Sequence, residues 1–128
     1  MLPSTPPLNE DIFDELIAMA GPEIAPQLLQ QILEDLDQVS RNLERALAQE
    51  DAKELHEQGH TLTSLAGTLG ATEIQTRAQE LNAISQSADI DAARGTVGTL
   101  LDDIGQLRHL VAVRSAALAD RSAGGGEA

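Results

Sequence analysis

Apolar residues recur at three- and four-residue spacing along most of the chain. This spacing puts them on one side of an α-helix, whereas a half-buried strand needs strict alternation, which we do not find. The longest stripe is widened on one side by Leu29 and Leu33 and consists of Leu28, Ile32, Leu36, Val39, Leu43 and Leu47. The pattern therefore predicts an all-α protein.

Capping residues and prolines divide this pattern into separate helices. Asn9 is a good N-cap for a short first helix, which Gly21 and Pro22 end. The long helix that carries the leucine stripe begins between Pro22 and Pro26, because proline is tolerated only in the first turn. The chain thus begins with a short helix followed by a long one.

Similar signals bound the helices that follow. Asp51 and Glu54 form a capping box, and Gly70 is a good C-terminal stop for the helix between them. Thr72 and Gln75 are expected to cap the next helix. These short connections favour helices that run antiparallel to their neighbours.

The last helix starts at Asp89 or Asp91 and carries its own apolar stripe through Val111. We therefore expect an antiparallel four-helix bundle over residues 9–119, with the additional short N-terminal helix packed on its end. Residues 1–8 are rich in proline and are expected to be disordered. Residues 120–128 contain three consecutive glycines and are expected to form a flexible tail.

Composition and charge restrict the function. The chain has 128 residues, a formal net charge of −13, and 8 Lys+Arg against 21 Asp+Glu. Binding to nucleic acid or to an anionic membrane requires cationic groups, so neither is expected. The absence of cysteine excludes disulfides and thiolate chemistry. No pattern of a signal peptide or membrane span is present, and a soluble cytoplasmic protein is expected.

The segment of residues 60–71 carries the candidate chemistry. At about 100° per residue, the His60 side chain points about 160° away from that of Leu62, which lies on the buried stripe. Thr63, Ser64 and Gly67 are the neighbours that could crowd the ring, and all three are small. The pattern predicts an exposed imidazole that a large partner can approach, although an ordinary surface histidine fits the same geometry.

The order of residues here resembles the signature of the histidine phosphotransfer (HPt) domain family. His60, Leu62, Gly67, Gly70 and Ala71 are among the matching positions, and the resemblance extends over roughly residues 10–115. It implies a phosphorelay intermediate that accepts a phosphoryl group on His60 from a receiver-domain aspartate and passes it to another. The implied partners are response-regulator receiver domains and a hybrid histidine kinase. The protein itself would need no cofactor, since Mg²⁺ belongs to the receiver.

Two residues depart from the family pattern. Thr63 stands where the family has lysine, and Ser64 stands where it has glycine. A lysine would offset the charge of the phosphoryl group, whereas Thr63 offers only a hydroxyl. The departures motivate an alternative, in which the protein is a non-phosphorylated module that docks onto receivers or inhibits them.

A second motif overlaps the same histidine. His56-Glu57-Gln58-Gly59-His60 matches the zinc-protease pattern, in which two histidines one turn apart bind Zn²⁺ and the glutamate activates water. Glu80 is a conceivable third ligand. Both histidines are expected on the solvent face without a cleft, so a zinc-dependent hydrolase is a remote alternative and no metal site is predicted.

The partner-docking surface is expected to surround His60. Leu29 and Leu33 lie at the edge of the leucine stripe, and we expect them to be exposed and to contact the receiver. Buried apolar contacts usually dominate such binding, with charge tuning its rate and specificity.

Overall fold

The computed structural model describes residues 8–87 and 89–126, of which residues 121–126 are described by their backbone alone. This part of the chain contains helices and no strand: α1 (Glu10–Ala48), α2 (Ala52–Leu69), α3 (Thr72–Gln86) and α4 (Ile90–Gly126). No helix in the described ranges is long and apolar enough to cross a membrane. The all-α prediction is confirmed.

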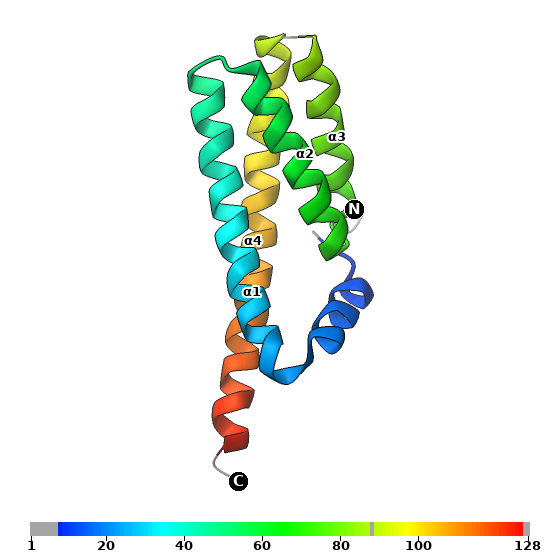
Figure 1. The fold of residues 1–128 in the computed structure, drawn as a ribbon, viewed down its shortest axis with the longest axis vertical. Helices are drawn as coiled ribbons and strands as arrows, with labels where there is room; N and C mark the ends of the chain where they lie inside the picture. Colours follow the sequence, from blue (N-terminus) through cyan, green and yellow to red (C-terminus); the bar gives the residue numbers. More distant parts are fainter. Residues whose placement is uncertain (1–7, 88, 127–128) are drawn as a thin grey trace, which may run out of the picture.

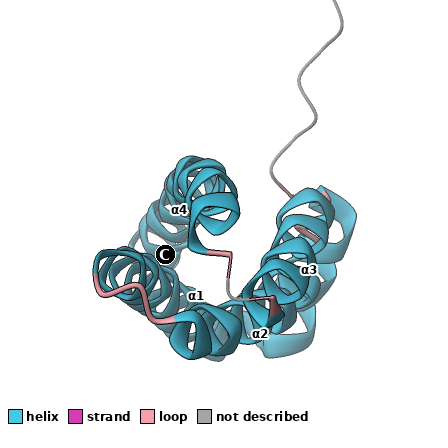
Figure 2. Cartoon of the chain, turned by 90° about the horizontal axis from the view of Figure 1, so that it is seen from above, coloured by secondary structure: helices cyan, strands magenta, loops and turns pink. Residues whose placement is uncertain are grey.

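The four helices form an antiparallel bundle. Successive helices run up and down along the long axis, with short turns at its ends (Figure 1). Seen from above, α1, α2, α3 and α4 follow one another around a common core (Figure 2). The predicted four-helix bundle is therefore confirmed, and His60 lies in α2, whose neighbours are α1 and α3.

The N-terminal end of α1 is a separate helical segment. Gly21 has φ 83° and ψ 163°, which interrupts the helix and turns the preceding segment back toward α2 (Figure 1). The side chain of Asn9 accepts hydrogen bonds from the backbone N–H of Asp11 and Ile12, as expected for its N-cap role. Residues 1–7 of the expected disordered segment lie outside the described residues, but Leu8 is buried in the core.

The core contains the predicted stripe at Ile32, Leu36, Val39 and Leu43, but its two ends differ by one residue. Leu29 and Leu33 have exposed fractions of only 0% and 8%, whereas Leu28 and Leu47 are half-buried. The buried positions follow a three–four spacing along α1: Leu29, Ile32, Leu36, Val39, Leu43 and Ala46. The expected exposure of Leu29 and Leu33 is therefore wrong, because both side chains belong to the core that the other helices cover.

Most of the predicted helix ends are confirmed. The Asp51 side chain accepts a hydrogen bond from the backbone N–H of Glu54, and Gly70 adopts the left-handed conformation at the end of α2. The expected capping role of Thr72 is wrong, because Thr72 is already the first helical residue of α3. Ala71 takes the N-cap position there and has no side-chain hydrogen bond.

The last helix continues to Gly126, beyond the domain boundary expected at residue 119. Before that boundary, α4 contacts the N-terminal segment of α1. Arg114 pairs with Asp14, and its guanidinium lies 4.9 Å from the centre of the Phe13 ring. The alanine-rich sequence before residue 120 favours helix, which explains why α4 extends past the predicted boundary. Residues 127 and 128 lie outside the described residues.

A second ion pair joins α4 to α1 within the bundle. Asp37 accepts two hydrogen bonds from Arg108, of 2.6 and 3.1 Å, in a bidentate arrangement. The hydrogen bond and the charge of Asp37 raise the pKa of the Arg108 guanidinium above its ordinary value. This contact helps to align the two long helices.

Candidate functional site

His60 lies near the middle of α2, and its side chain is exposed to solvent. The opposite side of the helix is packed into the core through Leu55, Leu62 and Leu69, all of which are fully buried. Ser64, one turn after His60, is also exposed. The structure therefore places the imidazole on an open face of α2.

Thr63 lies beside this face but its hydroxyl is already engaged. The side chain is half-buried, and its Oγ1 donates a hydrogen bond of 2.8 Å to the backbone carbonyl of Gly59. A phosphoryl group on His60 would present only acceptor oxygens, so Thr63 would have to break this bond in order to donate to it. Thr63 therefore does not replace the charge of the lysine that the family pattern has here.

Gly67 allows a side chain from α3 to reach across α2. A Cβ atom at Gly67 would lie 2.7 Å from Nε2 of Gln75. Gln75 thus leans over Gly67 and does not serve the capping role expected from the sequence. Gly67 has no side chain and therefore leaves room for Gln75 against α2. Spacing along α2 does not reveal this neighbour, because Gln75 belongs to another helix.

Gly59, immediately before His60, is a point of close contact between α2 and α3. It is buried, and a Cβ atom there would come within 3.0 Å of Oδ1 of Asn82 and 3.2 Å from the carbonyl oxygen of Ala78. The Asn82 oxygen is itself buried and has no hydrogen-bond partner among the described residues. The residue next to the candidate histidine therefore determines how closely α3 approaches.

The two histidines of the zinc-protease motif differ in their surroundings. His56 is half-buried and faces α3, where its Nδ1 lies 3.5 Å from Oγ of Ser85. His60 is exposed to solvent. Within residues 8–87 and 89–126, no three metal-binding side chains come together, so Glu80 does not join the pair as a third ligand. His109 lies exposed on α4.

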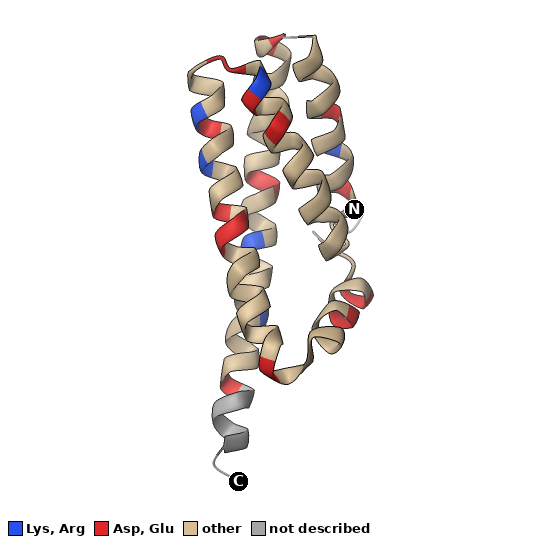
Figure 3. Ribbon diagram, viewed as in Figure 1, with Lys and Arg blue, Asp and Glu red and all other residues tan. Residues whose placement is uncertain are grey.

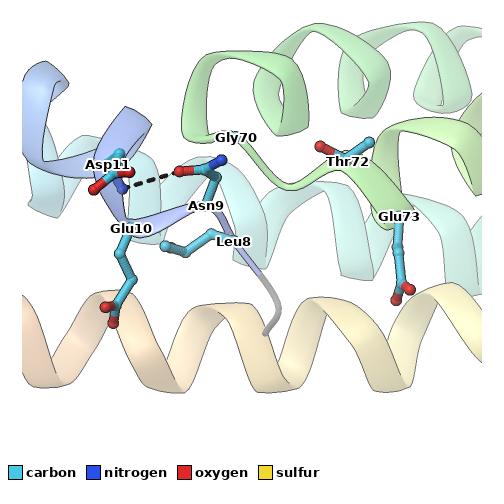
Figure 4. Close-up of a pocket in the computed structure, with 7 residues that line it drawn as sticks. All are labelled: Leu8, Asn9, Glu10, Asp11, Gly70, Thr72 and Glu73. Carbon is cyan, nitrogen blue, oxygen red and sulfur yellow. Dashed lines mark hydrogen bonds between the residues drawn. The ribbon is translucent and has the colours of Figure 1, made fainter. Parts of the chain in front are cut away.

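A hollow of about 630 Å³ lies at the far end of α2, where the starts of α1 and α3 meet. Figure 4 shows Glu10 and Glu73 extending from opposite sides of it toward α4. Gly70, which lines it, is ten residues from His60, or about 15 Å along the helix. This hollow therefore does not include the candidate histidine.

The comparison with protein families decides the identity. The Hpt domain model matches residues 27–110, which is well over half of the chain and includes His60. This chain belongs to the Hpt domain family. It is an HPt phosphotransfer protein, as the residues around His60 suggested. Among the curated proteins, the comparison finds no match.

A solved structure shares the fold of this HPt protein. It is the crystal structure of histidine-containing phosphotransfer protein B (HptB) from Pseudomonas aeruginosa PAO1, with a TM-score of 0.81. The match covers 89% of this chain and 98% of HptB, at 20% sequence identity. At this identity the likeness shows the fold, and the roles of individual residues rest on the geometry described above.

The expected docking residues do not take part in this site. Leu29 and Leu33 lie in the core and offer no surface to a partner. The polar side chains of Gln75 and Asn82 belong to α3 and lie against Gly67 and Gly59 of α2. Their position could not be read from spacing along α2, because it depends on how the two helices pack.

Proposed function

We propose that His60 carries the phosphoryl group in a two-component phosphorelay. The observation that supports this role is an exposed imidazole on a helix whose neighbouring positions are small, within the segment matched by the family model. An exposed imidazole with small neighbours lets a folded receiver domain bring its phospho-aspartate up to the ring.

The proposed reaction is a simple displacement at phosphorus. A lone pair on one imidazole nitrogen of His60 attacks the phosphoryl group, and the other ring nitrogen keeps its proton. The bond between phosphorus and the aspartate oxygen breaks, and the carboxylate leaves with the bonding electrons. The receiver would contribute Mg²⁺, which neutralises the phosphoryl oxygens. The reverse displacement passes the group to the aspartate of a second receiver, and we place this relay in the cytoplasm.

The direct test is phosphorylation by receiver domains. Purified protein is incubated with phosphorylated receivers from the same organism, and the label is scored for stability in base and lability in acid. His60→Gln should keep its helical circular dichroism and take up no label. His56→Gln and His109→Gln are matched controls that should remain labelled. A label that persists on His60→Gln would move the acceptor to another residue and contradict the proposal.

A docking module without phosphoryl transfer is the second candidate. The engaged hydroxyl of Thr63 favours it, because no side chain at this position offsets the charge of a phosphoryl group. Under this alternative, receivers bind the face around His60 but never label it. The same experiment separates the two functions, since binding without label in every receiver tested would favour the docking module.

A further inference from the structure

His56 and His60 are one turn apart in α2, the first half-buried and the second exposed. Residues four apart in a helix have Cβ atoms about 5–6 Å apart, so both imidazoles can reach one ligand. The same spacing holds a single Zn²⁺ ion in proteins with the H-E-x-x-H pattern. A hydrolytic site needs a third protein ligand and a cleft, whereas binding of an exchangeable metal ion does not.

A contact with α3 fixes the proton of His56. Oγ of Ser85 donates a hydrogen bond of 2.9 Å to the backbone carbonyl of Asn82, which uses its only proton. Toward Nδ1 of His56, 3.5 Å away, Ser85 is therefore the acceptor, and Nδ1 carries the proton of the neutral ring. The lone pair of His56 is then on Nε2. Histidines that bind a metal usually donate their other ring nitrogen in this way.

The charges around this pair favour a cation. The protein has a formal net charge of −13. Figure 3 shows the charged positions of α2 near its start, and these are Lys53, Glu54 and Glu57. The side chains of α3 that approach α2 here, Asn82 and Ser85, are neutral. The two carboxylates outnumber the one ammonium group, so this part of the surface attracts a divalent cation.

We infer that His56 and His60 together bind one Zn²⁺ ion and that the bound ion prevents phosphorylation of His60. Each neutral ring donates the lone pair of one nitrogen, and water fills the remaining positions. The nitrogen of His60 that holds the ion has no lone pair left to attack phosphorus. Metal and phosphoryl group therefore exclude each other, and the ion is an inhibitor and not a cofactor. The inhibition rests on the proposed function, whereas the metal site does not.

The metal site is tested by calorimetry on unphosphorylated protein without a histidine tag. Zn²⁺ is titrated in the presence of excess Mg²⁺, which prefers oxygen ligands and occupies carboxylate sites. Wild-type protein should bind one Zn²⁺ ion. His56→Gln and His60→Gln should each bind it at least about tenfold more weakly, because the second ligand on the same helix binds intramolecularly. His109→Gln is the control and should leave the affinity unchanged, since His109 has no histidine one turn away.

Two serines at the end of α3 test how His56 is positioned. Ser85 and Ser87 both donate to the carbonyl three residues earlier, but only Ser85 also contacts His56. Ser85→Ala should weaken Zn²⁺ binding about tenfold, as expected for the loss of a group that orients a metal ligand. Ser87→Ala should not change it. Equal affinities in the two variants would remove the role of Ser85.

The inhibition is tested by labelling with a phosphorylated receiver. At a free Zn²⁺ concentration ten times the dissociation constant, the labelling rate of the wild type should fall about tenfold, because only the metal-free fraction reacts. His56→Gln should be labelled at the same rate with and without this amount of Zn²⁺. The variant also controls for any effect of Zn²⁺ on the receiver, which would slow both proteins equally.

Several outcomes would overturn the inference. Zn²⁺ binding of wild-type strength in His56→Gln would mean that the two histidines do not share an ion. Equal slowing of wild type and His56→Gln by Zn²⁺ would place the inhibition on the receiver. If no receiver labels His60, the proposed function fails by itself, and the calorimetry still decides whether the metal site exists.

Discussion

The hydroxyl of Thr63 donates its hydrogen bond to the carbonyl oxygen of Gly59, one turn earlier in α2. Because this bond uses its proton, Thr63→Val should leave the phosphorylated fraction of the protein nearly unchanged. Thr63→Lys should raise that fraction a few-fold at low salt, since an exposed charge-assisted contact contributes about 0.5–1 kcal/mol. The fraction is measured at equilibrium with a phosphorylated receiver, and the gain should shrink as salt is added.

Ser64 provides the comparison for this experiment. It is exposed one turn after His60, and Ser64→Gly should change the phosphorylated fraction less than Thr63→Lys while lowering helix stability. A wild-type protein that no receiver phosphorylates, beside a Thr63→Lys variant that accepts the group, would identify the natural protein as a docking module. A large loss in Thr63→Val would show that the hydroxyl serves the phosphoryl group after all.

The contact between Gly59 and Asn82 predicts a packing cost next to the site. Gly59→Ala places a methyl group against Oδ1 of Asn82, whereas Gly98→Ala on α4 meets open space. Both substitutions gain the same helix propensity, about 1 kcal/mol. Overpacking typically costs about 1–3 kcal/mol, so Gly59→Ala should be less stable than Gly98→Ala by that amount in urea unfolding.

A double variant checks the cause of that difference. In Gly59→Ala/Asn82→Ala the overlapping oxygen is removed, and most of the lost stability should return. Equal stability of the two single glycine variants would mean that α3 moves away at little cost, and that Gly59 does not set the spacing of the two helices.

Leu29 and its neighbour Leu28 form a matched pair for testing the core. Leu29 is fully buried and Leu28 is half-buried. Leu29→Ala should lower the free energy of unfolding by about 2–5 kcal/mol, and Leu28→Ala should lower it by clearly less. Thermal and urea unfolding measure both. A stable Leu29→Ala variant with weakened receiver binding would restore the docking role that the burial of Leu29 contradicts.

Alanine substitutions at Gly70 and Gly21 distinguish the cost of backbone strain from the cost of a packing clash. Both have positive φ, of 72° and 83°, so alanine is strained at either position. A Cβ atom at Gly70 would also lie 2.9 Å from Cβ of Ile12, while none of the described atoms lies within 4 Å of one at Gly21. Gly70→Ala should therefore be more destabilising than Gly21→Ala in the same unfolding experiment. Equal losses would indicate that the contact between α2 and the N-terminal segment yields easily.

The sequence by itself determined the helices and the location of the candidate histidine. Three- and four-residue spacing, Asn9, Asp51 and Gly70 are local signals, because capping and amphipathicity depend on residues within a few positions. His60 could be placed opposite Leu62 for the same reason, since both belong to one regular helix. Periodicity predicted that His60 is exposed, and the family motif indicated that such a histidine takes part in phosphoryl transfer.

Tertiary structure decided what periodicity left open. Two pairs of adjacent apolar residues, Leu28 with Leu29 and Ile32 with Leu33, allow the buried stripe of α1 to be drawn in more than one phase, and only the neighbouring helices select one. The contacts of Gly59 with Asn82 and of His56 with Ser85 involve residues far apart in sequence. Helical geometry relates side chains within one helix, whereas distances between helices depend on how all the faces pack together.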